Sequence, residues 1–365
     1  MTPLLLALAL LGCRDRAVPV QDGQPANVVM GAELAYVSLA GDGVGVVDPG
    51  GATVATVAPP EGVDGVHALA MYNALLFGLD ATPPGHLLVY DLEDPRAPAL
   101  VGEPRAVPVG PFTGLAVHNG VVVVSGGDGP LSMTTYDGQG ALGAELTQAR
   151  YERSTPDVAL HATGELGFVS TRFNMVNQGE SYGLMSLRFH PPPAAPEVLD
   201  RLYLPGAGYT AGVASPADFP LASTVQAWHL YVAHGAGLAV VDVSDPADIQ
   251  VRSVTVLPVF GVDVAVEGER AYVVGSRPMP MLVELDVRKP DLPQVLEAIP
   301  LPEDALATGV AVRKGRVMVA AGPAGVLVFE REPPAPEERV EHDDDPIGPY
   351  LLDLDPSLAG PPGTK

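Results

Sequence analysis

Seven short hydrophobic segments, each ending in or next to a charged residue, recur along the chain at intervals of 43 to 54 residues. Their end residues are Asp48, Asp91, Asp137, Arg188, Asp242, Asp286 and Glu330. A period of this length, with several strand-like segments in each period, is typical of β-propeller blades. A helical solenoid would need long segments of 3.6-residue periodicity, which the sequence lacks. The sequence therefore predicts an all-β fold, a seven-bladed β-propeller built from repeats of about 43–54 residues, with flexible tails.

Each repeat contains the same succession of strand-like segments. In the sixth repeat they are 263–268, 269–275, 281–286 and 294–302, and they are rich in Val, Ile and Tyr. Such residues favour a pleated sheet, and the Gly, Asn, Asp and Pro between them favour turns. A single blade would leave an apolar face exposed, so we expect neighbouring blades to pack face to face in a closed ring.

The last repeat lacks an outer strand, because residues 332–346 are rich in proline and acidic residues. Two segments could supply that strand. One is residues 16–20, near the N-terminus, and the other is residues 350–354. The sequence slightly favours the N-terminal segment.

The composition predicts one large folded domain with tails. Of 365 residues 47% are hydrophobic, and 41 Gly and 39 Pro indicate many turns. We assign residues 26–331 to the propeller and 332–365 to a disordered Pro-rich acidic tail. The net charge of −24 argues against nucleic acid and against an anionic membrane surface as partners.

The N-terminus predicts a lipid anchor. An apolar run at 4–11, too short to span a bilayer, is followed by Gly12 and by Cys13, the only cysteine. Residues 10–13 resemble a bacterial lipobox, so residues 1–13 are interpreted as a lipoprotein-type signal segment with Cys13 as the lipidation site and 14–25 as a tether. The alternatives are an ordinary cleaved signal peptide and a cytosolic N-terminus. No acidic residue follows Cys13 directly, which favours anchoring at the outer membrane of the cell envelope, with the domain periplasmic or surface-exposed.

The recurrent strand endings carry a family resemblance. Residues 91–98, 242–246 and 286–293 contain an Asp four residues before a Pro, and segments such as 35–37 precede them as Ala-Tyr-Val. This pattern resembles the LVIVD repeat. The resemblance implies a propeller of the bacterial cell surface and no particular reaction. Asp and Pro at these positions favour tight turns, so we interpret them as structural.

Catalytic motifs are absent from the sequence, which contains no Gly-x-Ser-x-Gly, phosphate-binding glycine loop or His-Glu-x-x-His. The sequence predicts no cofactor and no metal. The first residues of the innermost strands, expected to surround the axial channel, are Asn27, Ala68, Gly114, Asp157, Gly212, Asp263 and Gly309. Asn27, Asp157 and Asp263 are therefore candidate channel residues. His118 and His161 occupy equivalent strand ends, a position interpreted as variable and structural.

Two insertions interrupt the period and predict binding loops. One is 172–182, between the second and third strands of the fourth repeat. The other is 216–226, which we place between the first and second strands of the fifth repeat, on the rim of the His118 and His161 turns. Those positions would put the insertions at opposite ends of the blades. The candidate binding residues are Phe173, Met175, Tyr182 and Phe219.

These features favour a binding or assembly scaffold for a protein or surface-polymer partner, attached to the membrane only through its lipid. The alternative is an extracytoplasmic enzyme, a lactonase-like hydrolase or lyase with a site at the channel mouth. A third reading is a purely structural surface protein. The sequence leaves the oligomeric state open.

Overall fold

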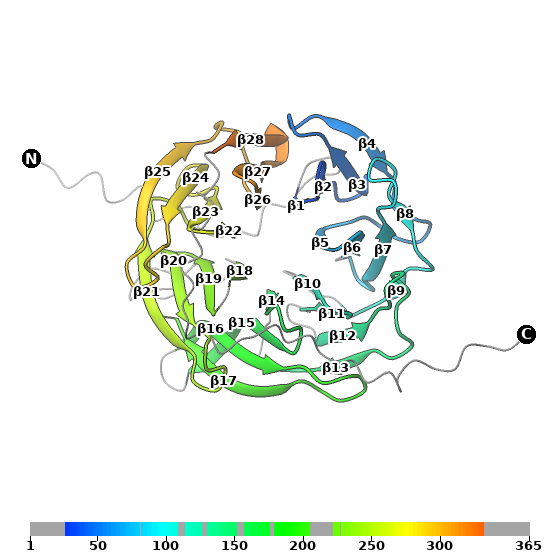
Figure 1. The fold of residues 1–365 in the computed structure, drawn as a ribbon, viewed down its shortest axis with the longest axis horizontal. Coiled ribbons are helices and arrows are strands. Elements are labelled where there is room, and N and C mark those ends of the chain that lie inside the picture. Colours follow the sequence, from blue (N-terminus) through cyan, green and yellow to red (C-terminus); the bar gives the residue numbers. More distant parts are fainter. Residues whose placement is uncertain are drawn as a thin grey trace, which may run out of the picture.

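The structure is a computed structural model that describes residues 26–80, 82–108, 114–125, 130–151, 157–175, 179–204, 222–226 and 228–331. Seven antiparallel sheets surround a central axis, which confirms the predicted seven-bladed β-propeller (Figure 1). Within these ranges the one helical element is the short 3₁₀ helix η1 (Gly322–Ala324). No helix there is long and apolar enough to cross a membrane.

Each blade is a meander whose strands follow one another from the axis outward. The first strands are β1 (Asn27–Met30), β5 (Ala68–Tyr72), β10 (Leu115–His118), β14 (Val158–Leu160), β18 (Ala222–Gln226), β22 (Asp263–Glu267) and β26 (Gly309–Arg313). The second strands are β2 (Ala35–Ser38), β6 (Leu75–Asp80), β11 (Val121–Val124), β15 (Leu166–Met175), β19 (His229–His234), β23 (Arg270–Gly275) and β27 (Arg316–Ala320). The third strands are β3 (Val44–Val47), β7 (His86–Asp91), β12 (Leu131–Thr135), β16 (Gly179–Arg188), β20 (Gly237–Asp242), β24 (Met281–Asp286) and β28 (Val326–Glu330). The outer strands are β4 (Thr53–Val57), the pair β8 (Ala99–Leu100) and β9 (Arg105–Ala106), β13 (Thr147–Ala149), β17 (Glu197–Tyr203), β21 (Gln250–Val256) and β25 (Gln294–Pro300).

The meander gives the ring two distinct faces. All first strands begin at the face that also carries the connections between second and third strands, and this is called the hairpin face. All first strands end at the opposite face, which carries the turns between third and fourth strands and is called the turn face.

The core lies in the seams between blades. Seven clusters of buried side chains are present, and each draws its members from two neighbouring blades. At the last seam Met318 and Ala320 of the seventh blade pack against Val28, Ala35 and Val37 of the first. Burial of these apolar surfaces from water is the main stabilising contribution, so the ring is stable as a whole rather than blade by blade.

The aspartates at the strand ends cap turns, as the sequence predicts. Asp242 Oδ1 accepts the Ser244 N–H at 2.8 Å, and Asp286 Oδ1 accepts the Arg288 N–H at 3.0 Å. Asp48, Asp91 and Asp137 do the same. Such Asx turns satisfy backbone donors that would otherwise lack a partner.

The prolines of these turns also connect blades, which the sequence does not reveal. The Pro95 carbonyl accepts the Tyr36 hydroxyl of the preceding blade at 3.0 Å, and the Pro290 carbonyl accepts the Ser253 hydroxyl at 2.6 Å. Pro246 accepts the Ser186 hydroxyl in the same way. The repeated turn therefore holds its own blade and fastens it to the blade before it.

The first strand of the fifth blade and the outer strand of the seventh blade bear on the predicted repeat. The first strand of the fifth blade is β18, whose Ala222 pairs with Ala233, so the prediction that it begins at Gly212 is wrong. Residues 216–226 consequently do not connect the first and second strands of that blade. The seventh sheet has three strands within the described residues. Both segments proposed to complete it, 16–20 and 350–354, lie outside those residues. Cys13, the tether and the tail also lie outside them.

Candidate functional site

The largest departure from the regular blade is the hairpin formed by β15 and β16. These strands have ten residues each, and their pairing continues to Met175 opposite Gly179. The neighbouring strand β17 ends opposite Gly183, and β14 begins opposite Val169. Residues 172–175 and 179–182 therefore pair only with each other among the described residues, as a two-stranded arm on the hairpin face.

The second departure is the connection between the fourth and fifth blades. The connection from β17 to β18 takes residues 204–221, whereas the corresponding connections elsewhere take six to ten residues, for example 257–262. It leaves from Tyr203, opposite Gly183 at the base of the arm, and returns at Ala222 on the hairpin face. Both insertions thus start and end on the same face, and the second starts at the base of the first. The expectation that they leave opposite ends of the blades, with the second on the rim of the His118 and His161 turns, is wrong because it assigned the wrong strand as β18.

The candidate binding residues fall in these two insertions. Strand register places Phe173 opposite Ser181 and Tyr182 opposite Arg172, with Met175 at the end of the arm. Phe219 lies outside the described residues. A binding role for these four residues stays a prediction.

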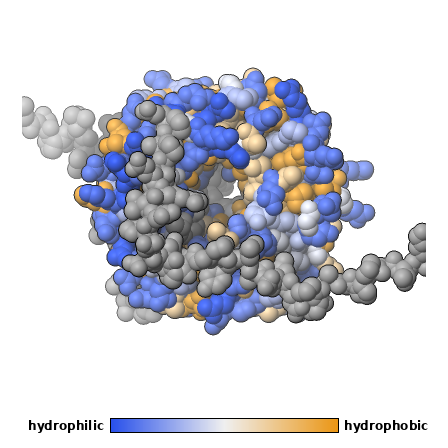
Figure 2. All heavy atoms as spheres, in the orientation of Figure 1, coloured by the Kyte–Doolittle hydropathy of each residue, from blue (hydrophilic) through white to orange (hydrophobic). Residues whose placement is uncertain are grey.

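The candidate channel residues lie at the hairpin-face mouth of the axial channel, whose opening is visible in Figure 2. Asn27 Oδ1 accepts the Leu69 N–H of the second blade at 3.1 Å. Asp263 Oδ2 accepts the Val310 N–H of the seventh blade at 2.7 Å, and its Oδ1 accepts the Val264 N–H at 2.8 Å. Asn27 and Asp263 therefore join neighbouring first strands around the mouth.

Asp263 is electrostatically unusual. Burial raises the pKa of this carboxyl to about 7, and the charge of Asp157 contributes in the same direction. The two backbone N–H groups act against the shift, because they favour the ionised form, but burial outweighs them. A carboxyl that titrates near neutral pH fits proton transfer, and it also fits a structural group in a poorly solvated position.

Residues at the ends of the first strands, including His118 and His161, contact neighbouring blades on the turn face. His118 lies edge-on to Tyr72 at 4.9 Å between ring centres, and His161 stacks on Trp228 at 4.5 Å. Equivalent residues in other blades reach the next blade too. Glu267 accepts the Lys314 N–H at 2.6 Å, and Arg313 donates to the Met30 carbonyl at 3.3 Å. The position is variable in residue type but structural in role, in agreement with the sequence interpretation.

The sequence misses one cluster of histidines. On the hairpin face of the second blade, His67 Nδ1 lies 3.6 Å from Asp80 Oδ1, and His86 Nδ1 lies 3.5 Å from Asp80 Oδ2. Asp80 is buried and also accepts the Thr82 N–H at 2.9 Å. His67 directly precedes β5, Asp80 ends β6 and His86 begins β7, so no sequence motif marks them. In the part of the chain that the structure describes, no group of three or more His, Cys, Asp or Glu side chains is arranged to hold a metal ion.

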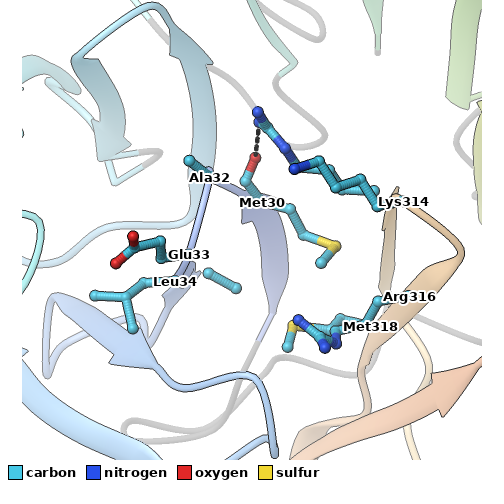
Figure 3. Close-up of a pocket in the computed structure, with 10 residues that line it drawn as sticks. Met30, Ala32, Glu33, Leu34, Lys314, Arg316 and Met318 are labelled. Carbon is cyan, nitrogen blue, oxygen red and sulfur yellow. Dashed lines mark hydrogen bonds between the residues drawn. The ribbon is translucent and has the colours of Figure 1, made fainter.

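Two hollows lie on the turn face. A cleft of about 710 Å³ between the second and third blades is lined by Tyr72 and Tyr136 and by Asp91, Glu93 and Asp137. A pocket of about 120 Å³ lies at the seam of the seventh and first blades (Figure 3). Its lining includes Arg313, Lys314, Arg316 and Glu33, together with Met30 and Met318. Arg316 is paired with Glu330 at 2.7 Å, so part of this positive charge is already neutralised.

Comparison with protein families identifies the repeat. Residues 227–253, which contain β19, β20 and the capped turn at Asp242, match the family described as "LVIVD repeat". The chain carries an LVIVD repeat. The match covers 27 residues, and the resemblance of residues 91–98 and 286–293 to the same repeat follows from their shared Asp and Pro positions. No curated protein matches the sequence.

Solved structures with the same fold have diverse functions. Hydrazine synthase of Kuenenia stuttgartiensis is 12% identical, with a TM-score of 0.63 over 87% of this chain and 98% of that chain. Virginiamycin B lyase of Staphylococcus aureus is 8% identical, with a TM-score of 0.57 over 84% and 94%. A chain of the mitotic checkpoint complex is 13% identical, with a TM-score of 0.57 over 88% and 98%. Identities this low show the shared fold alone.

Proposed function

We propose that this protein is a lipid-anchored β-propeller of the bacterial cell envelope that binds a protein or surface-polymer partner through its hairpin face. The observation that carries the proposal is that both insertions start and end on that face, and that the connection 204–221 leaves its strand opposite Gly183 at the base of the arm 172–182. In repeat architectures, insertions confined to one face commonly form the binding surface.

The fold is compatible with this role without deciding it. The similar chain of the mitotic checkpoint complex belongs to a protein assembly, whereas virginiamycin B lyase is an enzyme. The other blades have the same strands and turns without these insertions.

The lipid anchor is supported by the apolar run that ends at Gly12 and Cys13. Cys13→Ala should abolish labelling with a radioactive or clickable fatty acid and move the protein from the membrane fraction to the soluble fraction. Undiminished membrane retention of this variant would rule out lipidation as the tether.

Binding is tested by altering the arm. Phe173→Ser combined with Met175→Ser should abolish recovery of the partner when the protein is purified from detergent-solubilised envelopes after mild cross-linking. The matched control is Leu292→Ser, which removes a 62% exposed apolar side chain from the turn face. Loss of the partner in the control but not in the arm variant would refute the assignment of the binding face.

A second function is favoured by the histidine cluster. A buried carboxylate against the Nδ1 atoms of two histidines is an arrangement that orients imidazole for general acid–base catalysis. The cluster lies on the hairpin face, where His67 precedes the channel residue Ala68. An enzyme at this site would lose hydrolysis of a simple ester or lactone in His86→Gln while partner recovery stayed unchanged. A scaffold would show no such hydrolysis and would keep its partner in the same variant.

A further inference from the structure

The third strand of the seventh blade is exposed in a way that its counterparts are not. Residues Val326 to Phe329 of β28 are all half-buried. By contrast, all four residues of β3 are buried, as are the first five of β20. In those blades an outer strand covers the third strand, and in the described residues β28 has no such neighbour. An open apolar strand edge is a pairing site for another strand.

Connection lengths indicate which segment covers β28. A strand at 16–20 would leave residues 21–26 to reach β1, and six residues make the corresponding connection at 257–262 and eight make it at 301–308. A strand at 350–354 would need residues 331–349 between third and outer strands. The other blades use 5 to 11 residues there, for example 48–52 and 136–146. The N-terminal segment fits the geometry of every other blade, and the C-terminal segment does not.

We propose that residues 16–20 form the outer strand of the seventh blade, antiparallel to β28. In the first and fifth blades the last residue of the outer strand pairs with the first residue of the third strand, Val57 with Val44 and Val256 with Gly237. The same match in the seventh blade places Val20 opposite Val326, and therefore Val18 opposite Val328. Pro19 is acceptable because an outer strand exposes one edge, where a missing N–H breaks no ladder bond. The ring is then closed by chain from both ends of the propeller.

This closure orients the protein on the membrane, a consequence that rests on the proposed lipid anchor. The outer strand begins at the turn face, so Arg16 lies at that rim of the seventh blade. Cys13 is three residues further, a reach of at most about 10 Å. The turn face near the seventh blade therefore lies against the bilayer, and the hairpin face with its two insertions points away from it, free to bind a partner.

The closure is tested by disulfide formation in the full-length chain with Cys13→Ser, which is free of other cysteines. Val18→Cys with Val328→Cys should form an intramolecular disulfide under mild oxidation, since facing residues of antiparallel strands have suitable spacing. Two control pairs are Leu352→Cys with Val328→Cys, for the C-terminal segment, and Val18→Cys with Val254→Cys, on the distant β21. Mass spectrometry of the non-reduced digest identifies each cross-link.

A disulfide between positions 18 and 328 within one chain, with no disulfide in either control pair, is the expected result. A bridge between positions 352 and 328, a disulfide-linked dimer of two copies, or no bridge in any pair would each overturn the proposal. None of these results depends on lipidation, so a failure of the anchor is seen separately in membrane fractionation.

Orientation is then tested in membranes carrying the lipidated protein. Lys314→Cys on the turn face should be shielded from a bulky maleimide-polyethylene glycol reagent, and Glu303→Cys on the hairpin face should react at least several-fold faster. Both residues are exposed and lie at the seventh blade. Equal reactivity of the two, or faster reaction at position 314, would contradict the orientation even if the strand closure holds.

Discussion

Replacing Asp263 by asparagine tests the electrostatics of the channel mouth. Asn27 occupies the same position in the first blade, and its amide oxygen accepts the N–H of the next blade just as Asp263 does. Asp263→Asn should therefore keep the contact with Val310 and remove the ionisable group. The loss of the Val264 N–H contact to Oδ1 costs about 1 kcal/mol at every pH.

The magnitude follows from linkage. The carboxyl has a pKa of about 7 in the folded state and an ordinary value of 3.8. Because the folded state holds the proton more tightly, this group's stabilising contribution is complete below about pH 4 and is lost as the pH rises through 7. At 1.36 kcal/mol per pKa unit, the loss amounts to about 4 kcal/mol between pH 4 and pH 8. The free energy of unfolding of Asp263→Asn, relative to wild type, should rise by that amount over the same interval.

The assay is urea unfolding of the soluble Cys13→Ser protein and of its Asp263→Asn derivative at several pH values from 4 to 8. The difference between the two curves cancels the titration of all other groups. The reciprocal control is Asn27→Asp, which should acquire a loss of stability with rising pH. If the Asp263→Asn curve runs parallel to wild type across this range, Asp263 titrates normally and the inference of a desolvated carboxyl is wrong.

Two further predictions concern stability away from the channel. Asp242→Ala removes the cap on the Ser244 N–H, and Ser253→Ala removes the interblade hydrogen bond to the Pro290 carbonyl. Each variant should lower the free energy of unfolding by about 1 kcal/mol without affecting partner recovery. Loss of binding at an unchanged melting temperature would instead make the turn a functional site. His234 is fully buried, and burial lowers its pKa to about 4, so its neutral form stabilises the fold above pH 6.5 and this contribution is lost as the pH falls towards 4. His234→Asn, which keeps an acceptor for the Ala236 N–H, should reduce that acid loss by about 3 kcal/mol, and an unaltered acid transition would contradict it.

The parts of the fold visible in the sequence are those with a local cause. Asp242 and Pro246 predict a turn, because the aspartate carboxylate and the fixed φ of proline act on backbone within a few residues. The repeat of such turns then gives the number of blades. The interblade bonds from Tyr36, Ser186 and Ser253 to the turn prolines could not be predicted, since each depends on how two blades meet in space.

The wrong strand assignment in the fifth blade and the missed histidine cluster both concern features that depend on how strands pair in space. Residues 206–215 are rich in Gly and Ala and resemble a first strand, whereas the actual strand β18 follows at Ala222, and this choice decided on which face the second insertion was placed. The cluster of His67, Asp80 and His86 could not be predicted, because its members come together only through the pairing of β5, β6 and β7. The candidate channel residues were chosen by their position in the repeat, and their contacts to Leu69 and Val310 depend on the neighbouring blades.

The most direct test of the account is residue-specific photo-cross-linking in living cells. A photoreactive phenylalanine analogue is introduced at Asn174 on the arm and, in a matched strain, at Gln139 on the turn face. We predict a discrete cross-linked partner from position 174 and none from position 139. A partner captured only from the turn face, or none from either position despite normal folding and membrane attachment, would contradict the proposal that the hairpin face is the binding surface.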